Sequence, residues 1–202
     1  MLHLANHCSR DRSGSNPEDG TNGVPETSYS LSSGRKDWTL DFGNLALAIL
    51  RIWVGIVMFV HGANHARTLA GTGRWLSRVG WRAPRFQARL LAVVEIAIGI
   101  GLILGLMTTP AASGAVAVVL VAFATEHLRN GFFIFNKGQG YEYVVTLAVA
   151  GAALALLGGG GWSLDSLLDV KLTGAHNGRI LLAAIALGAV HVAASRRPGR
   201  NS

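Results

Sequence analysis

The chain has little charge, few aromatic side chains and almost no cysteine. One cysteine, Cys8, occurs in 202 residues, which excludes an internal disulfide framework and any CxxC redox or zinc motif. Charged residues make up 14% of the chain, where about 25% is usual for a soluble domain, and aromatic residues make up only 7%. An ordinary water-soluble globular domain is therefore not expected.

Apolar sequence is abundant instead, and it is concentrated in blocks. Half of the residues are hydrophobic, so the chain as a whole is not intrinsically disordered. Residues 1–43 are predicted to form a disordered polar tail, because most of them are Ser, Gly, Asn, Asp, Thr and Pro with scattered charges. No apolar run of the length that a signal peptide needs occurs before Leu45. We interpret Cys8, within this tail, as a solvated thiol. From Leu45 onward the composition becomes strongly apolar.

Five apolar stretches each approach the roughly 20 residues that a helix needs to cross a bilayer. They lie at about 44–64, 89–107, 111–128, 142–159 and 178–195. Backbone groups in lipid must bond within their own segment, so these stretches are predicted to be helices. The fold class is thus all-α: a polytopic membrane bundle with a four-helix core over 44–169 and an additional transmembrane helix in 170–202. A soluble bundle is the disfavoured alternative, since the last four stretches lack a polar face at period 3.6.

Basic residues near the predicted helix ends are distributed unequally between the two sides of the membrane. Eleven Lys and Arg residues fall on one side and four on the other. The loop after the first helix carries six of them and no acid: Arg67, Arg74, Arg78, Arg82, Arg85 and Arg89. The positive-inside rule then places this loop and the C-terminus in the cytoplasm and the N-terminus outside. Nucleic-acid binding is the alternative interpretation of these arginines, but topology and membrane lipids with anionic headgroups explain them more simply.

Ionisable side chains within the predicted spans are candidates for function, because such groups are costly in lipid. On the first helix, Arg51, His61 and His65 fall within an arc of about 80°, with Gly55 and Gly62 beside it. The other helices bring further polar groups to the level of the two histidines, beneath the cytoplasmic headgroups. These groups are Glu95, Glu126, His127, Glu142 and Tyr143. We expect them to line one pocket suited to proton-coupled chemistry with a lipid-phase substrate.

Simpler interpretations of the same residues stay open. His61 and His65 have the i, i+4 spacing of metal-binding helices but no HExxH signature, so no metal site is predicted. Glu95 could pair with an imidazole or with Arg89 merely to hold the bundle together. Toward the outer face, Asp165 follows a run of four glycines and Trp162, and it is the candidate partner of Arg51 in a structural ion pair.

Several short motifs, taken in order, resemble the DoxX family of bacterial membrane proteins over about residues 44–169. These motifs are His61-Gly62, Glu95 with Gly99 and then Gly105 to Thr108, His127 to Phe133, Gly140 to Tyr143, and Gly159 to Asp165. The chain departs from the family where His65 replaces the usual lysine three residues after the His-Gly pair. The polar tail and the fifth helix lie outside the resemblance.

The resemblance implies a four-helix protein of the bacterial plasma membrane. DoxX relatives are associated with membrane oxidoreductases, including a thiosulfate to quinone enzyme and assemblies with sulfurtransferase and superoxide dismutase partners. A quinone and a soluble oxidoreductase or sulfurtransferase-type partner are therefore expected rather than a flavin, haem or nucleotide, for which the chain carries no motif.

Our leading hypothesis is a non-catalytic or co-catalytic membrane subunit of a quinone-linked redox system, and the sequence leaves open whether the chain is itself an enzyme. In this hypothesis Glu95 exchanges the proton, His61 is its hydrogen-bond partner, and Tyr143 positions the ligand. A small proton-coupled transporter or channel, or a purely structural anchor, remains the alternative. A transporter would move solute or protons in proteoliposomes without a partner.

Overall fold

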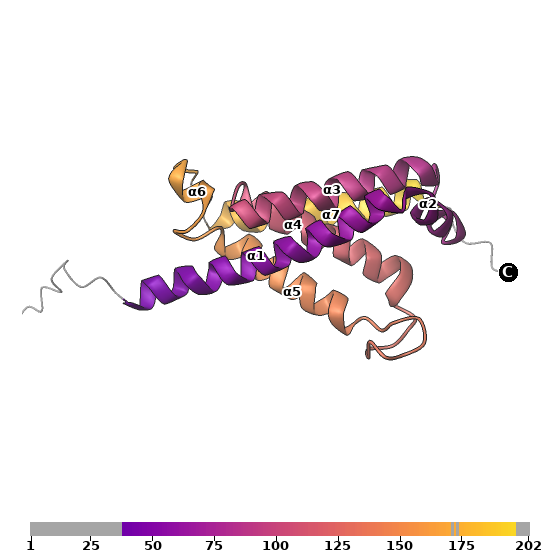
Figure 1. Ribbon diagram of the computed structural model, residues 1–202, viewed down its shortest axis with the longest axis horizontal. Helices are drawn as coiled ribbons and strands as arrows, with labels where there is room; N and C mark the ends of the chain where they lie inside the picture. Colours follow the sequence, from indigo (N-terminus) through magenta and orange to yellow (C-terminus); the bar gives the residue numbers. More distant parts are fainter. Residues whose placement is uncertain (1–37, 171, 173, 197–202) are drawn as a thin grey trace, which may run out of the picture. The chain divides into compact units, whose positions relative to one another are not determined.

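A computed structural model describes residues 38–170, 172 and 174–196, and the secondary structure of this part is helical (Figure 1). The elements in chain order are α1 (Trp38–Arg67), α2 (Leu69–Arg78), α3 (Pro84–Leu104), α4 (Thr108–Ala122), the π-helical turn η1 (Phe123–His127), α5 (Glu142–Leu157), α6 (Leu164–Leu167) and α7 (Ala175–Ser195). Helix α1 thus begins at Trp38, six residues before the predicted start of the first span at 44. The rest of the predicted polar tail, with Cys8, lies outside the described residues.

The prediction of a multi-pass helical bundle is confirmed. Four segments are long and apolar enough to cross a membrane: Phe42–Arg67, Pro84–Leu104, Thr108–His127 and Ala175–Ser195. The fifth predicted span, α5, is apolar but has only 16 residues. Large apolar side chains such as Trp53, Val93 and Val149 are exposed on the outside of the bundle, as lipid-facing positions would be.

Helices α1 and α3 pack against each other at unusually short distance, and glycine permits it. A Cβ atom on Gly99 would lie 2.6 Å from the backbone nitrogen of Phe59 and 2.8 Å from the carbonyl oxygen of Gly55. A Cβ atom on Gly62 would lie 2.7 Å from the backbone nitrogen of Ile96. Small residues at such contacts are how membrane helices gain close van der Waals packing. This packing brings the C-terminal end of α1, with His65, against the middle of α3.

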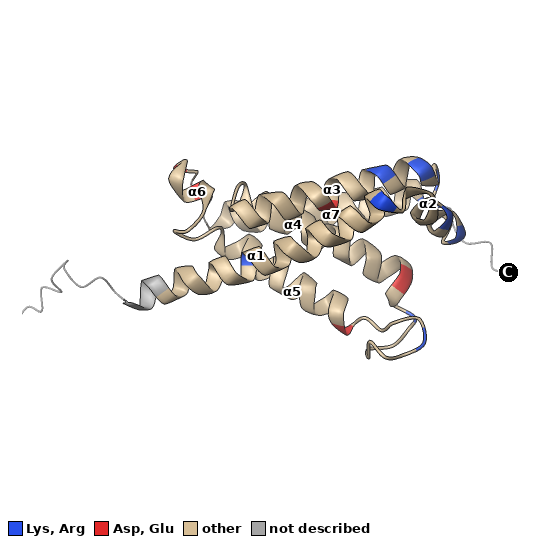
Figure 2. Ribbon diagram, viewed as in Figure 1, with Lys and Arg blue, Asp and Glu red and all other residues tan. Residues whose placement is uncertain are grey.

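The arginine-rich loop predicted between the first two spans contains a helix, α2. Its buried residues, Thr72, Gly73 and Leu76, face α3, whereas Arg74 and Arg78 are exposed. Figure 2 shows Lys and Arg gathered over α2 and the adjoining end of α3. We call this the arginine end of the bundle. A short amphipathic helix with arginines on its outer face suits the surface of a membrane with anionic lipids.

A tight turn joins α3 to α4. Gly105 ends α3 in the left-handed region at φ 68°, and its N–H and that of Leu106 bond back to Leu102 and Gly101. Helix α4 then packs against both α5 and α7, and Val54, Leu102 and Leu154 are among the fully buried side chains between the helices. The C-terminal end of α7 contacts the arginine end of the bundle, where the Arg82 N–H donates a hydrogen bond to the Ser195 carbonyl at 2.8 Å.

Candidate functional site

A cavity of about 630 Å³ lies inside the bundle, with walls from α1, α2, α3, α4, η1, α5, α7 and the loop before α5. Most of its lining is aliphatic, including Leu90, Leu91 and Val118. Five of the predicted pocket residues also line it: His61, His65, Glu95, His127 and Tyr143. The cavity is therefore an apolar chamber with a small number of polar groups, which is the usual composition of a small-molecule site.

The cavity opens to the outside of the bundle. Ile134, Tyr143 and Leu187 line the cavity and are also exposed, Leu187 by 70%. Leu187 lies near the middle of α7, a helix long enough to span the hydrocarbon layer. An opening at that depth gives access from lipid, so a ligand that enters there must be soluble in the membrane.

Glu95 is the most deeply placed acid of the site. It is the twelfth of the 21 residues of α3, about 16 Å along the helix from Pro84, and it is 6% exposed. Its Oε2 atom is buried and has no hydrogen-bond partner among the described residues. The carboxyl group thus lies deeper than the sequence analysis placed it, because α3 begins five residues earlier than predicted.

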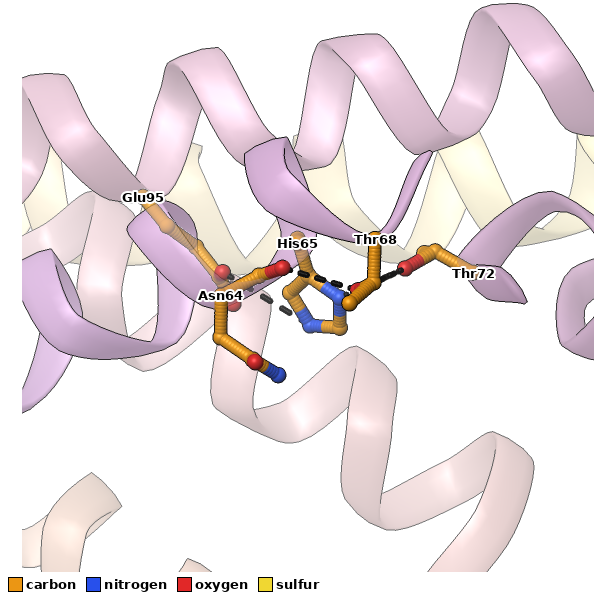
Figure 3. A network of polar contacts seen from close by, with 5 residues as sticks. All are labelled: Asn64, His65, Thr68, Thr72 and Glu95. Carbon is orange, nitrogen blue, oxygen red and sulfur yellow. Dashed lines mark hydrogen bonds and ion pairs between the residues drawn. The ribbon is translucent and has the colours of Figure 1, made fainter. Parts of the chain in front are cut away.

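The imidazole nearest to Glu95 is that of His65. Its Nε2 lies 3.8 Å from Glu95 Oε2, and its Nδ1 lies 3.0 Å from the Thr72 hydroxyl (Figure 3). Thr72 is 3.4 Å from the hydroxyl of Thr68, which donates to the Asn64 carbonyl at 2.8 Å. The sequence analysis assigned His61 as the partner of Glu95. His61 does line the cavity, but across the part of the chain that the structure describes it makes no hydrogen bond or ion pair with Glu95.

Glu126 and Glu142 do not line the cavity, although both were predicted to do so. Successive helical residues point about 100° apart, so the neighbours of a lining residue face elsewhere. The π-helical turn η1 directs Thr125 and His127 to the cavity, with His127 Nδ1 donating to the Gln139 carbonyl at 3.0 Å. On α5, Tyr143 and Val144 line the cavity instead of Glu142. The depth of these two acids was predictable, but their direction around the helix axis was not.

At the opposite end of the bundle, Arg51 and Asp165 meet at the same loop but bind backbone groups rather than each other. Arg51 is 2% exposed, and its Nη2 donates to the Trp162 carbonyl at 2.7 Å. The Asp165 carboxylate accepts from the Met107 and Thr108 N–H groups at 2.6 and 2.8 Å. Among the described residues no direct salt bridge joins Arg51 and Asp165, but the carboxylate of Asp165 still interacts electrostatically with the Arg51 guanidinium.

The dipoles of two helix ends explain why Arg51 and Asp165 bind backbone groups. The guanidinium of Arg51 lies against Gly105, beyond the C-terminus of α3, where the helix dipole favours a cation. Asp165 binds the first N–H groups of α4, where the dipole favours an anion. Arg51 still joins α1 to the segment after α5, which is the positional role expected of it.

The cavity also has polar lining residues that were not expected from the sequence, among them Trp81, Gln87 and His191. Trp81 is 7% exposed, and its indole N–H has no partner within the described residues. His191 Nε2 donates to Gln87 Oε1 at 3.1 Å, and the rings of Trp81 and His191 lie 5.5 Å apart. His191 was not among the residues predicted to form the site. Its position among small apolar residues of α7 was the available signal.

Part of the chain that forms this cavity matches a known protein family. Residues 46–128 match the family model described as DoxX. This segment of the chain is therefore similar to the DoxX family. The matched segment contains α1 from Ala46 onward, then α2, α3, α4 and η1, so it includes His61, His65 and Glu95. The DoxX match ends near His127 rather than at about 169, so α5 and α7 lie outside it. No curated protein and no solved structure is significantly similar to the chain.

The i, i+4 spacing of His61 and His65 also occurs in metal-binding helices. Among the residues that the structure describes, no group of three His, Cys, Asp or Glu side chains is placed to hold a metal ion. The arrangement that is present combines one buried carboxyl group, several imidazoles and an apolar chamber. Such a site can exchange a proton with a lipid-soluble ligand.

Proposed function

We propose that the cavity binds a quinone or a similar lipid-soluble carrier, and that the chain is a membrane subunit of a redox system. One observation carries the proposal: the buried Glu95 Oε2 atom has no hydrogen-bond partner among the described residues, and Glu95 lines an apolar cavity that opens toward lipid. Buried polar atoms normally have a partner. A ligand with a ring oxygen at one end and an apolar body would supply that partner and fill the chamber.

The proposed chemistry assigns a proton to Glu95 and the electrons to a partner protein. Oxidation of a bound quinol releases two electrons and two protons. Glu95, as the carboxylate, accepts one proton from the ring hydroxyl that faces it, and the other ring hydroxyl releases its proton to water. Both electrons pass to an oxidised redox centre of a soluble oxidoreductase partner. His65 stabilises the charge on Glu95, and Tyr143, at the opening of the cavity, positions the ring.

The orientation in the membrane follows from the same proposal. We place the arginine end in the cytoplasm of a bacterial cell, where anionic lipids and the soluble partner are available. The exposed Arg74 and Arg78 of α2 support this orientation, because they are on the outer face of an amphipathic helix.

Tryptophan fluorescence tests ligand binding directly. Trp75 and Trp81 line the cavity, so a decyl-substituted benzoquinone bound there should quench their emission in a saturable way. Ala184 also lines the cavity, and we expect Ala184→Phe to fill part of it and weaken quinone binding about tenfold or more, a loss of about 1.4 kcal/mol. Trp75→Phe and Trp81→Phe variants identify which indole reports binding.

Ala189→Phe is the matched control, because Ala189 is exposed on the same helix and does not line the cavity. It should bind the quinone as the unmodified protein does. Quenching that rises linearly with quinone concentration, with no saturation and no difference between the two variants, would show only partitioning of the probe into lipid or detergent. That result would refute the proposed binding site.

A further inference from the structure

We propose that His65, Thr72 and Thr68 form a proton path that connects Glu95 with the arginine end of the bundle. Figure 3 shows these side chains in sequence, from the carboxyl group of α3 to the turn between α1 and α2. The inference deepens the proposed function, on which it rests for the source of the proton, by naming the route that the proton takes.

The first link joins Glu95 to His65. Oε2 of the carboxyl group and Nε2 of the imidazole face each other at 3.8 Å, which is longer than a hydrogen bond. A small side-chain rotation or one bridging water closes this gap. Because no other described residue bonds to Glu95 Oε2, the imidazole is the nearest recorded group to which its proton can pass.

The hydrogen bonds beyond His65 have a defined direction, because the last group of the series, the Asn64 carbonyl, can only accept. The Thr68 hydroxyl donates to the Asn64 carbonyl at 2.8 Å, so its oxygen is left to accept. Thr72, 3.4 Å away, can then donate to Thr68 and accept in turn from His65 Nδ1 at 3.0 Å. The hydroxyl groups of Thr72 and Thr68 thus both donate in the direction away from the cavity.

This direction assigns the tautomer of His65. Neutral imidazole carries one N–H, and the bond to Thr72 requires it on Nδ1. Nε2 then presents its lone pair to Glu95, where it can accept the carboxyl proton. The bond to Thr72 therefore prepares His65 to act as a base at the cavity, as the orienting partner of a catalytic histidine does.

One transfer along the path conserves every proton. The Glu95 O–H bond breaks as the His65 Nε2–H bond forms, and the Nδ1 proton passes to Thr72. The hydroxyl proton of Thr72 passes to Thr68, whose own O–H turns from the Asn64 carbonyl to solvent and releases its proton to water. Thr72 is 6% exposed and Thr68 is exposed, so the path runs from the protein interior to solvent. Return of the His65 proton from Nε2 to Nδ1, by rotation of the imidazole, and of the hydroxyl groups to their first orientation prepares the next transfer.

Two observations favour this route over others. Thr68 occupies the N-cap position of α2, yet its hydroxyl makes no capping bond and turns back to α1 instead. The other titratable groups of the cavity are His61, His127, Tyr143 and His191, and the recorded bonds of His127 and His191 go to Gln139 and Gln87. Within the described residues, only His65 links Glu95 to an exposed hydroxyl.

Infrared spectroscopy of hydrogen–deuterium exchange tests the path without a partner protein. The protonated Glu95 carboxyl group gives a C=O stretching band, which the Glu95→Gln variant identifies by its loss. We expect transfer of the full-length protein into D2O to shift this band about tenfold more slowly in Thr72→Val than in the unmodified protein, because one hydrogen-bonded link is missing. Thr72→Ser, which retains the hydroxyl, should exchange at the original rate.

Thr68→Val should slow exchange as Thr72→Val does, and it changes an exposed side chain that folding tolerates well. Thr146→Val is the matched control, since Thr146 donates to the i−4 carbonyl of Glu142 outside the cavity. Unchanged exchange in both Thr72→Val and Thr68→Val, or the absence of any protonated Glu95 band, overturns the path. Quinone quenching in the same variants separates the two proposals: slow exchange without quinone binding refutes only the ligand.

Discussion

Glu95→Gln is expected to bind the reduced form of a decyl-substituted benzoquinone about 10- to 100-fold more weakly than the unmodified protein. At a pH where the infrared band of the protonated carboxyl group has disappeared, a quinol hydroxyl donates to the Glu95 carboxylate in a charge-assisted hydrogen bond. Such a bond contributes about 1.5 to 3 kcal/mol, and the amide oxygen of glutamine is a weaker acceptor. The oxidised quinone has only acceptor oxygens, to which a glutamine amide can donate. Its affinity should therefore change by less than about threefold. Tryptophan quenching measures both affinities in one preparation.

Glu142→Gln is the control for this measurement. Glu142 begins α5 next to Tyr143, but it does not line the cavity, so its neutralisation should leave both affinities unchanged. Equal weakening of quinol and quinone by Glu95→Gln would show that the carboxyl group only shapes the cavity. An effect of Glu142→Gln as large as that of Glu95→Gln would mean that net charge, and not the position of Glu95, governs binding.

Gly99→Ala is expected to destabilise the bundle by about 3 kcal/mol, at the upper end of the range for overpacking. The added Cβ would lie 2.6 Å from the backbone nitrogen of Phe59, and backbone atoms cannot move aside as a flexible side chain can. Helices α1 and α3 must separate instead, which also draws His65 away from Glu95. In a chain of this length such a loss corresponds to a fall of about 6 to 12 °C in the apparent Tm, measured in detergent.

Gly178→Ala provides the comparison, because a Cβ at Gly178 on α7 meets no atom within 4 Å. Alanine is the better helix former, so this variant should be unchanged or more stable by up to about 1 kcal/mol. If Gly99→Ala and Gly178→Ala had the same Tm, the close approach of α1 and α3 would not contribute to stability.

The membrane helices could be predicted from sequence because lipid imposes a local requirement. A span must be apolar over its whole length, whatever it packs against, so composition alone located the four long spans and the shorter apolar helix α5. The sequence analysis placed Gly55 and Gly62 beside the polar arc of the first helix. Both lie at the contact between α1 and α3, as does Gly99. Helix α2 was missed because its apolar positions are few, and packing against α3 decides that it is helical.

Several residues of the candidate site could be predicted, but the depth of Glu95 and the directions of Glu126 and Glu142 could not. Glu95, His65 and His127 face the cavity, whereas Glu126 and Glu142 are adjacent to lining residues and do not. The π-helical turn η1 and the contacts of α5 set these directions, and neither has a signature in the sequence. Thr72 and Thr68 were missed for a related reason, since a hydroxyl group gains significance only from the imidazole placed beside it.

Photolabelling tests the central claim, that the cavity around Glu95 holds a quinone-type ligand, most directly. The full-length protein in membranes is irradiated with an azido-substituted benzoquinone, and the labelled residues are identified by mass spectrometry. The account predicts label on cavity residues such as Leu91, Val118 and Leu187, reduced by excess unmodified quinone. Label confined to outward-facing residues such as Trp53, Val93 and Val149, with no competition by excess quinone, would contradict it.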